Sequence, residues 1–232
     1  MKFILIFIVV IVLIICEIDR TRYISHRIDN YYIKNFPIQI YNGLHNTLYT
    51  FLTKKYIYDI TKFEIYHYMK THYLHVREDF FKNYNKKETI TLFAHDTTNM
   101  FEKDYNYSYI QFKQFNIKHL QNIIKFPSIQ MLLKKFTNIR TAFISIIKSP
   151  KVIPFHRGPY NGVLRCHFPI FVDNPTDSYI QVMDKKLFYN KPFIFDDTYP
   201  HKLVKNDKGT RVVLILDIDN PYSPFLYHKY YY

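Results

Sequence analysis

The sequence predicts an α+β protein in which a mainly β core follows a helical region. Between residues 28 and 136, apolar and aromatic residues recur at three- and four-residue steps, as they do in amphipathic helices. From 137 to 221, short β-rich runs follow one another without a helical pattern between them. This order favours an antiparallel, jelly-roll-like core over a parallel βαβ fold.

The chain opens with a hydrophobic segment, residues 1–19. Its apolar run, Phe3 to Cys16, would rise about 21 Å as a helix, against roughly 30 Å for the hydrocarbon core of a membrane. Glu17 and its neighbours make a poor cleavage site, so we expect an uncleaved, single-pass signal-anchor. Its orientation in a secretory or viral membrane stays open. Arginines up to Arg27 favour a cytoplasmic remainder, whereas a glycosylation sequon at Asn106 favours a secretory lumen.

Residues 20–232 are expected to form a single domain, since this length is enough for one sizeable core. In the helical part, about 28–136, the spacing predicts one long helix within residues 60–84. Two shorter helices are predicted within 117–136, broken at the step from Phe126 to Pro127. In the β core, about 137–221, strands are predicted within residues 140–150, 163–172, 178–183, 191–197 and 210–219.

Composition excludes two classes of protein. The formal charge of +13 arises mostly from Lys, in a chain also rich in Ile, Asn, Tyr and Phe, as is typical of AT-rich coding. No compact basic run or nucleic-acid motif appears, so we expect no nucleic-acid partner. The two cysteines, Cys16 and Cys166, lie in segments not expected to meet, which excludes a disulfide framework and makes Cys166 an ordinary buried thiol.

Charged residues occur where the predicted β core should be apolar. Alternation places Arg165 and His167 on one face of their strand, and both faces of that strand are expected to be buried. No acidic residue stands beside Arg165, and Arg211 has none on its own face until Asp217. A buried guanidinium without a carboxylate costs several kcal/mol. We therefore expect a ligand to supply the missing anion, because Arg suits a carboxylate best.

Two histidines precede these arginines at similar distances. His156 lies nine residues before Arg165, and His201 lies ten residues before Arg211. The parallel spacing predicts two strand pairs that each offer one imidazole and one guanidinium to a shared interior. Two imidazoles with open coordination positions suit a redox-active Fe(II), and a neighbouring Arg suits a dicarboxylate co-substrate.

Two motifs carry a resemblance to the aspartyl/asparaginyl β-hydroxylase family. "FHRGPYNGVLRCH" is similar to the family pattern in which H-x-G-P-x-N leads into R-x-H. "FIFDDTYPHKLVKNDKGTRVVLILDIDNP" is similar to its second half, F-D-D-x-x-x-H followed ten residues later by an Arg-led strand. The resemblance covers about residues 106–221, with both motifs in the right order and at the right spacing.

This resemblance implies a double-stranded β-helix (jelly roll, cupin-like) and an Fe(II)- and 2-oxoglutarate-dependent dioxygenase. Such an enzyme uses O₂ to hydroxylate a protein or peptide side chain, here the β-carbon of Asp or Asn. Most related oxygenases have a third, carboxylate ligand two residues after the first His. This family has Gly there and binds iron with two histidines, and this chain likewise has Gly158. The matching residues are His156 and His201 for the iron and catalysis, and Ser145, Arg165, His167 and Arg211 for 2-oxoglutarate.

Several alternatives stay open at this stage. One alternative is that the same scaffold hydroxylates a lipid or a small molecule at a membrane. Another is a catalytically degenerate, membrane-anchored binding protein. Asp197, four residues before His201, is a candidate third ligand, but a turn residue that orders the His201 loop as an outer acceptor is the preferred interpretation. The substrate and the oligomeric state are not determined by the sequence.

Overall fold

The computed structural model describes residues 2–21, 49–50, 52–84, 107–115, 117–158 and 162–223. Within these ranges most of the helical residues precede the β core, as the sequence predicts. The helices are α1 (Lys2–Thr21), α4 (Glu64–Tyr84), α5 (Leu120–Lys125) and α6 (Pro127–Lys135), with a 3-10 helix at Ile60–Lys62.

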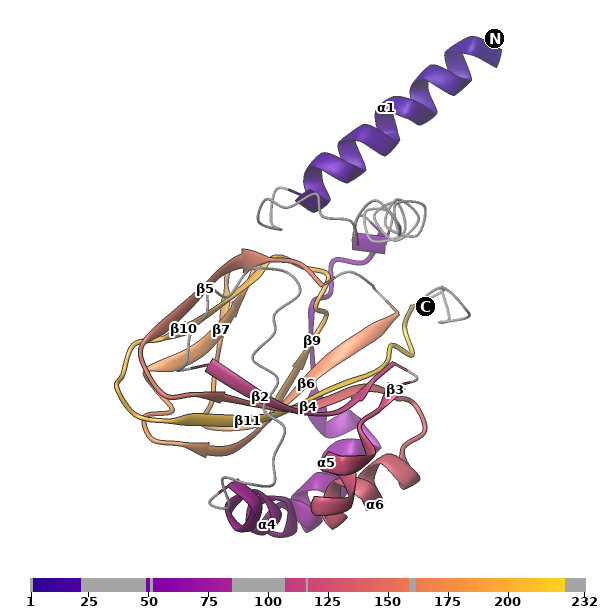
Figure 1. Ribbon diagram of the computed structural model, residues 1–232. Helices are drawn as coiled ribbons and strands as arrows, with labels where there is room; N and C mark the ends of the chain where they lie inside the picture. The colour runs from indigo at the N-terminus through magenta and orange to yellow at the C-terminus, as the bar shows by residue number, and fades with distance from the viewer. Residues whose placement is uncertain are drawn as a thin grey trace.

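Two antiparallel sheets form the β core, a jelly roll of the double-stranded β-helix type (Figure 1). The larger sheet has seven strands in the order β1-β9-β6-β11-β4-β2-β3, and the smaller has four in the order β5-β10-β7-β8. The predicted fold class is therefore confirmed. The strands are β1 (Ile57–Tyr58), β2 (Tyr107–Gln114), β3 (Ile117–Lys118), β4 (Ile139–Ile147), β5 (Lys151–His156), β6 (Val163–Val172), β7 (Ser178–Val182), β8 (Lys185–Phe188), β9 (Phe193–Phe195), β10 (His201–Lys205) and β11 (Arg211–Asp219).

The outer face of the larger sheet is apolar and is covered by helices. Leu214 and Leu216 of β11, with Cys166 and Phe168 of β6, are buried in one cluster with side chains from α4 and α6. Figure 1 shows these helices gathered beneath the larger sheet. Cys166 is a free, buried thiol, as expected. Helix residues in the cluster include Ile65, Met69, Val76 and Phe80 of α4, and Ile129 and Leu132 of α6.

The inner face of the same sheet faces the smaller sheet. Its residues alternate along each strand with those of the outer face. Val213 and Ile215 of β11 belong to a second apolar cluster, together with Val182 of β7 and Leu203 of β10. Strand alternation puts Arg211 on this inner face with Val213. The predicted alternation of apolar and charged residues is thus explained, because the charged residues lie between the two sheets.

The expected helical region also contributes to the sheets. Helices α4, α5 and α6 fall where the spacing predicts them, and α5 ends before the Phe126–Pro127 step. However, β2 pairs with β4 over most of its length, and the short strand β1 pairs with β9. Strand β2 buries Ile110 and Phe112, whose alternation within an aromatic-rich segment did not stand out from the helical spacing around it.

The N-terminal segment forms helix α1, with no interruption from Lys2 to Thr21. Among the described residues no helix is long and apolar enough to cross a membrane. The structure therefore does not bear out the predicted single-pass anchor. The physical reason lies in the sequence, since the apolar run ends at Cys16 and the charged Glu17 and Asp19 follow in the same helix. Asn106, the predicted sequon, lies outside the described residues.

Candidate active site

The two predicted iron ligands lie opposite each other in the smaller sheet. His156 is the last residue of β5 and His201 the first of β10, and the antiparallel register pairs them directly. Their ring centroids are 4.2 Å apart. The prediction that each strand pair carries one histidine and one arginine is therefore wrong. The two histidine strands pair with each other in one sheet, and the two arginine strands, β6 and β11, pair in the other. The shared interior between them is as predicted.

Both imidazoles are oriented by backbone carbonyls two residues earlier in the chain. Nδ1 of His156 lies 2.8 Å from the carbonyl oxygen of Pro154, and Nδ1 of His201 lies 2.9 Å from that of Tyr199. Since a carbonyl only accepts, each Nδ1 carries the proton when the ring is neutral, and Nε2 is left with a lone pair. Burial, with His156 nearby, lowers the pKa of His201 well below its usual value and keeps it neutral. This is the form that binds a metal.

Asp197 occupies the space in front of Gly158. A β-carbon on Gly158 would come within 2.1 Å of Oδ2 of Asp197, and the Gly158 amide donates to the Asp197 carbonyl at 2.7 Å. The other carboxylate oxygen, Oδ1, lies 3.2 Å from Nε2 of His201. Asp197 therefore brings a carboxylate, from the loop before His201, to the place where a residue-158 side chain would lie. A cation bound at Nε2 of His201 would therefore lie beside a carboxylate, which favours its charge.

Arg165 has the carboxylate partners that the sequence did not reveal. Its Nε donates to Oδ1 of Asp217 at 2.8 Å and its Nη2 to Oδ2 of the same residue at 3.0 Å. Its Nη1 donates to Asp197 at 3.0 Å. Burial opposes the charge, but the two carboxylates more than offset it and raise the pKa of Arg165. The expectation that Arg165 lacks a protein anion is wrong, because β6 and β11 place Asp217 directly opposite it.

Arg211 differs from Arg165, because it is wholly buried and has no carboxylate partner among the described residues. Its Nη1 donates to the hydroxyl of Ser145 on β4 at 3.2 Å, and its Nη2 donates to the hydroxyl of Tyr189. The guanidinium carbon also lies 4.1 Å from the centre of the Tyr189 ring. Nε has no hydrogen-bond partner in the described structure. A buried guanidinium held only by two hydroxyls is a site for an anion.

His167 lies beside Arg211 and is held by the same tyrosine. Its Nδ1 is 3.1 Å from the Tyr189 hydroxyl. Burial, helped by Arg211 and Arg165, lowers the pKa of His167 well below its usual value, so the ring is neutral. The Tyr189 oxygen accepts a hydrogen bond from Arg211. Burial raises the pKa of the Tyr189 hydroxyl, so it keeps its proton and donates a hydrogen bond to Nδ1 of His167. His167 then presents Nε2–H as a donor toward a bound anion.

The structure adds two residues that sequence reasoning did not assign to the site, Tyr189 and Asp217. Tyr189 is 2% exposed and joins Arg211 to His167. It stands in the short segment between β8 and β9, where nothing in the local sequence distinguishes it from other aromatic residues. Asp217 shares a face with Arg211, but it pairs with Arg165 across the strands. Only the register of β6 against β11 could have revealed that pair.

The residues fit a divalent metal and a dicarboxylate. The metal side offers two Nε2 atoms with the Asp197 carboxylate beside them. Within the ranges that the structure describes, no group of three or more His, Cys, Asp or Glu is arranged as a complete metal site. The anion side offers the unpaired Nε of Arg211 with the Ser145 hydroxyl beside it.

The protein is thus of the jelly-roll class, with a histidine pair and a buried arginine between its two sheets. Within that class, the chain belongs to the aspartyl/asparaginyl β-hydroxylase family, whose model matches residues 70–221. The match runs from α4 to just beyond the end of β11. The resemblance drawn from the two motifs is confirmed, and the protein is a member of a hydroxylase family.

Known proteins show similarity over part of the chain. The ornithine lipid ester-linked acyl 2-hydroxylase of Rhizobium tropici is 38% identical over 110 residues, which cover 46% of this chain and 39% of that protein. The chain thus spans about two fifths of the length of this relative. HygX from Streptomyces hygroscopicus, solved with nickel and 2-oxoglutarate, is 7% identical with a TM-score of 0.39 over 63% of this chain and 80% of HygX.

A 2-oxoglutarate-Fe(II) oxygenase family oxidoreductase from Burkholderia pseudomallei is 10% identical, with a TM-score of 0.37 over 50% of this chain and 69% of the other. Both TM-scores are low, so neither structure bears on the metal or the substrate of this chain.

Proposed function

We propose that this protein is an Fe(II)- and 2-oxoglutarate-dependent hydroxylase. One observation carries the proposal, namely that Arg211 is 0% exposed and lacks a carboxylate among the described residues. Its Nε has no partner there either. A guanidinium buried in this state needs an anion of fitting shape, and one end of 2-oxoglutarate is such an anion. The histidine pair, in which burial lowers the pKa of His201, supports a metal in the same interior.

Each residue has a role in this proposal. Nε2 of His156 and of His201 hold the metal, while their Nδ1 atoms stay bound to backbone carbonyls. Arg211 and Ser145 hold the distal carboxylate of the co-substrate. Arg165 uses three of its five N–H groups on Asp217 and Asp197, so two remain for a ligand.

His167 completes the co-substrate site with its Nε2–H. When bound, Fe(II) supplies the oxygen activation that couples 2-oxoglutarate and O₂ to substrate hydroxylation, with succinate and CO₂ as the other products. The carboxylates of Asp197 and Asp217 hold Arg165 in place between the metal side and the larger sheet. Tyr189 fixes both Arg211 and His167 through one hydroxyl, so the co-substrate meets groups that are already oriented.

For the substrate we propose the acyl group of a lipid. The relative from Rhizobium tropici is named for hydroxylation at an ester-linked acyl chain, and it is 38% identical over the aligned residues. A membrane-associated location would follow from such a substrate. The second candidate is the β-carbon of Asp or Asn in a peptide, which the family's description favours.

The first test is anaerobic addition of Fe(II) and 2-oxoglutarate to the full-length protein. We expect a visible metal-to-co-substrate charge-transfer band, then succinate release when air is admitted. Succinate formed in step with hydroxylated lipid, and not with hydroxylated Asp- or Asn-containing peptide, supports the acyl substrate. The reverse outcome supports the peptide.

His75→Ala serves as the matched control, because His75 is an exposed histidine on α4. It should keep both the band and the succinate. A folded wild-type protein that gives neither signal would reject the proposed co-substrate chemistry.

A further inference from the structure

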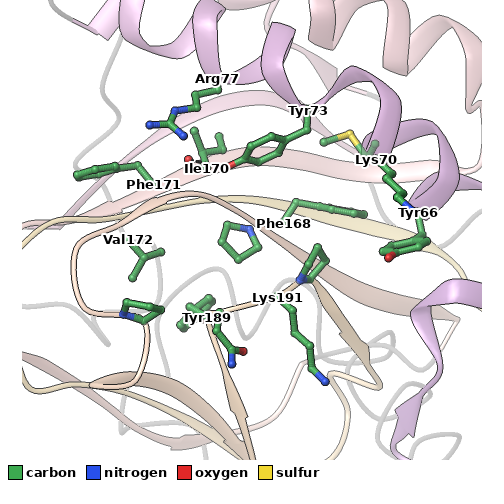
Figure 2. Close-up of a pocket in the computed structure, with 15 residues that line it drawn as sticks. Tyr66, Lys70, Tyr73, Arg77, Phe168, Ile170, Phe171, Val172, Tyr189 and Lys191 are labelled. Atoms are coloured by element: carbon green, nitrogen blue, oxygen red, sulfur yellow. Dashed lines mark hydrogen bonds between the residues drawn. The ribbon is translucent and has the colours of Figure 1, made fainter.

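A groove of about 580 Å³ lies outside the space between the two sheets. Helix α4 forms one wall, the second half of β6 forms the floor, and the segment from Tyr189 to Pro192 forms the opposite wall (Figure 2). Its volume falls in the range of roughly 300–1,000 Å³ that is typical of ligand pockets. Of the candidate active-site residues, only Tyr189 lines it. We refer to this second cavity as the α4 groove.

The interior of the α4 groove is apolar. The apolar surface that a ligand can reach belongs mainly to Pro169, Phe171 and Val172 of β6, which are partly exposed. Met69, Phe168 and Ile170 also belong to the lining, but they are at most 2% exposed and support the floor from within the core. Tyr73 reaches from α4 to β6 and donates a hydrogen bond to the Ile170 carbonyl at 2.8 Å, which fixes the width of the groove. Figure 2 shows Tyr73 above the side chains of β6. An apolar floor of this kind suits a hydrocarbon chain.

The rim of the α4 groove is basic. Lys70 and Arg77 are exposed on the helix wall, and Lys191 is exposed on the opposite wall, as Figure 2 shows. No acidic residue lines the groove. Within the described residues none of these three cations forms an ion pair, and Arg77 lies over the ring of Phe81 instead. Three cations around an apolar floor, without a carboxylate between them, complement an anion that carries an apolar tail.

We propose that the α4 groove binds an anionic amphiphile, an acyl chain with a carboxylate or phosphate head. The chain lies along the apolar floor, and the head meets the cations of the rim. A free fatty acid and a chain of an anionic membrane lipid share this chemistry. The site is additional to the proposed hydroxylase site, because neither His156 nor His201 lines the groove.

The experiment is calorimetric titration of the full-length protein with decanoate, below its micelle concentration and without iron or 2-oxoglutarate. We expect saturable binding that weakens about tenfold in the Lys70→Glu, Arg77→Glu double variant, because two attractions become repulsions. The control is Lys62→Glu with Lys134→Glu, which makes the same change of charge at exposed lysines outside the groove. Thermal unfolding of both variants checks that they fold.

Decyltrimethylammonium distinguishes charge recognition from simple apolar binding. The proposal is overturned if this cation binds as tightly as decanoate, or if the groove variant binds decanoate as well as the control variant does. Sedimentation with phosphatidylglycerol and phosphatidylcholine vesicles then separates a membrane-held chain from a free one. No variant changes the sequence of helix α1, so a difference in vesicle binding between the two variants does not come from this helix. Since the assays contain no iron, a failure of hydroxylation leaves their result unaffected.

Discussion

The outer and inner faces of the seven-stranded sheet are made from alternate residues of the same strands, and they differ completely in chemistry. On β11 the outward Leu214 and Leu216 are 0% exposed among other apolar side chains. The inward Arg211 and Asp217 are nearly as buried, but they are charged. Burial alone therefore does not separate the two faces. What separates them is that the outer face has no polar group to satisfy, whereas the inner face has a guanidinium that the described protein leaves without an anion.

The largest effect is expected on turnover, from His201→Ala on the side of the interior opposite Arg211. Loss of one of two metal ligands should lower succinate formation by about a thousandfold or more. The measurement is succinate release, together with titration of Fe(II) under anaerobic conditions. If the variant keeps the wild-type affinity for Fe(II), His201 is not a metal ligand, and the proposed metal site between the two sheets is rejected.

The next effect is expected on stability, from Leu214→Ala on the outer face. A cavity under α4 and α6 should lower the free energy of unfolding by about 3 kcal/mol. Leu74, which is 64% exposed on α4, provides the control, and its replacement by Ala should change stability by less than about 0.5 kcal/mol. Denaturant titration measures both. Affinity for 2-oxoglutarate should not change, and a parallel loss of affinity would show that the two faces are not separable.

The converse variant is Arg211→Met on the inner face. We expect 2-oxoglutarate to bind about thirtyfold more weakly, a loss of about 2 kcal/mol, while the unliganded protein stays at least as stable. No carboxylate among the described residues is left unpaired by this change. Arg140→Met is the control. Arg140 lies outside the site, and its Nε donates to Oδ1 of Asp219 at 2.6 Å. Unchanged affinity in Arg211→Met would contradict the assignment of the anion site.

The last effect concerns pH, and per pH unit it is the smallest change in free energy of these predictions. Asp196 is buried beside Asp197 with no cation partner among the described residues, and burial raises its pKa from 3.8 to about 7. The folded protein therefore holds a proton that the unfolded chain loses, and stability falls as the pH rises from about 4 to about 7. The slope is at most about 1.4 kcal/mol per pH unit. Asp196→Asn should flatten this part of the stability profile, as unfolding titrations at several pH values would show.

Local patterns were enough to predict much of the fold. The helical spacing predicted α4, α5 and α6, and the break at Phe126–Pro127 fell where expected. Five β runs predicted β4, β6, β7, β9 and β11. These predictions succeed because period and turn residues act within a few positions along the chain. The runs did not predict β1, β2, β3, β5, β8 and β10. Except for β2, these strands have at most six residues, so their local signal is weak.

The pair of histidines and the pair of arginines could be identified from residue type and spacing alone, since these carry the family's motifs. Tertiary structure decided which partner each of them has. It paired Arg165 with Asp217 and left Arg211 with two hydroxyls, although both arginines look alike in the sequence. The reason is that register between β6 and β11, and the return of Asp197 to Gly158, join residues far apart in the chain. No local pattern encodes such a contact.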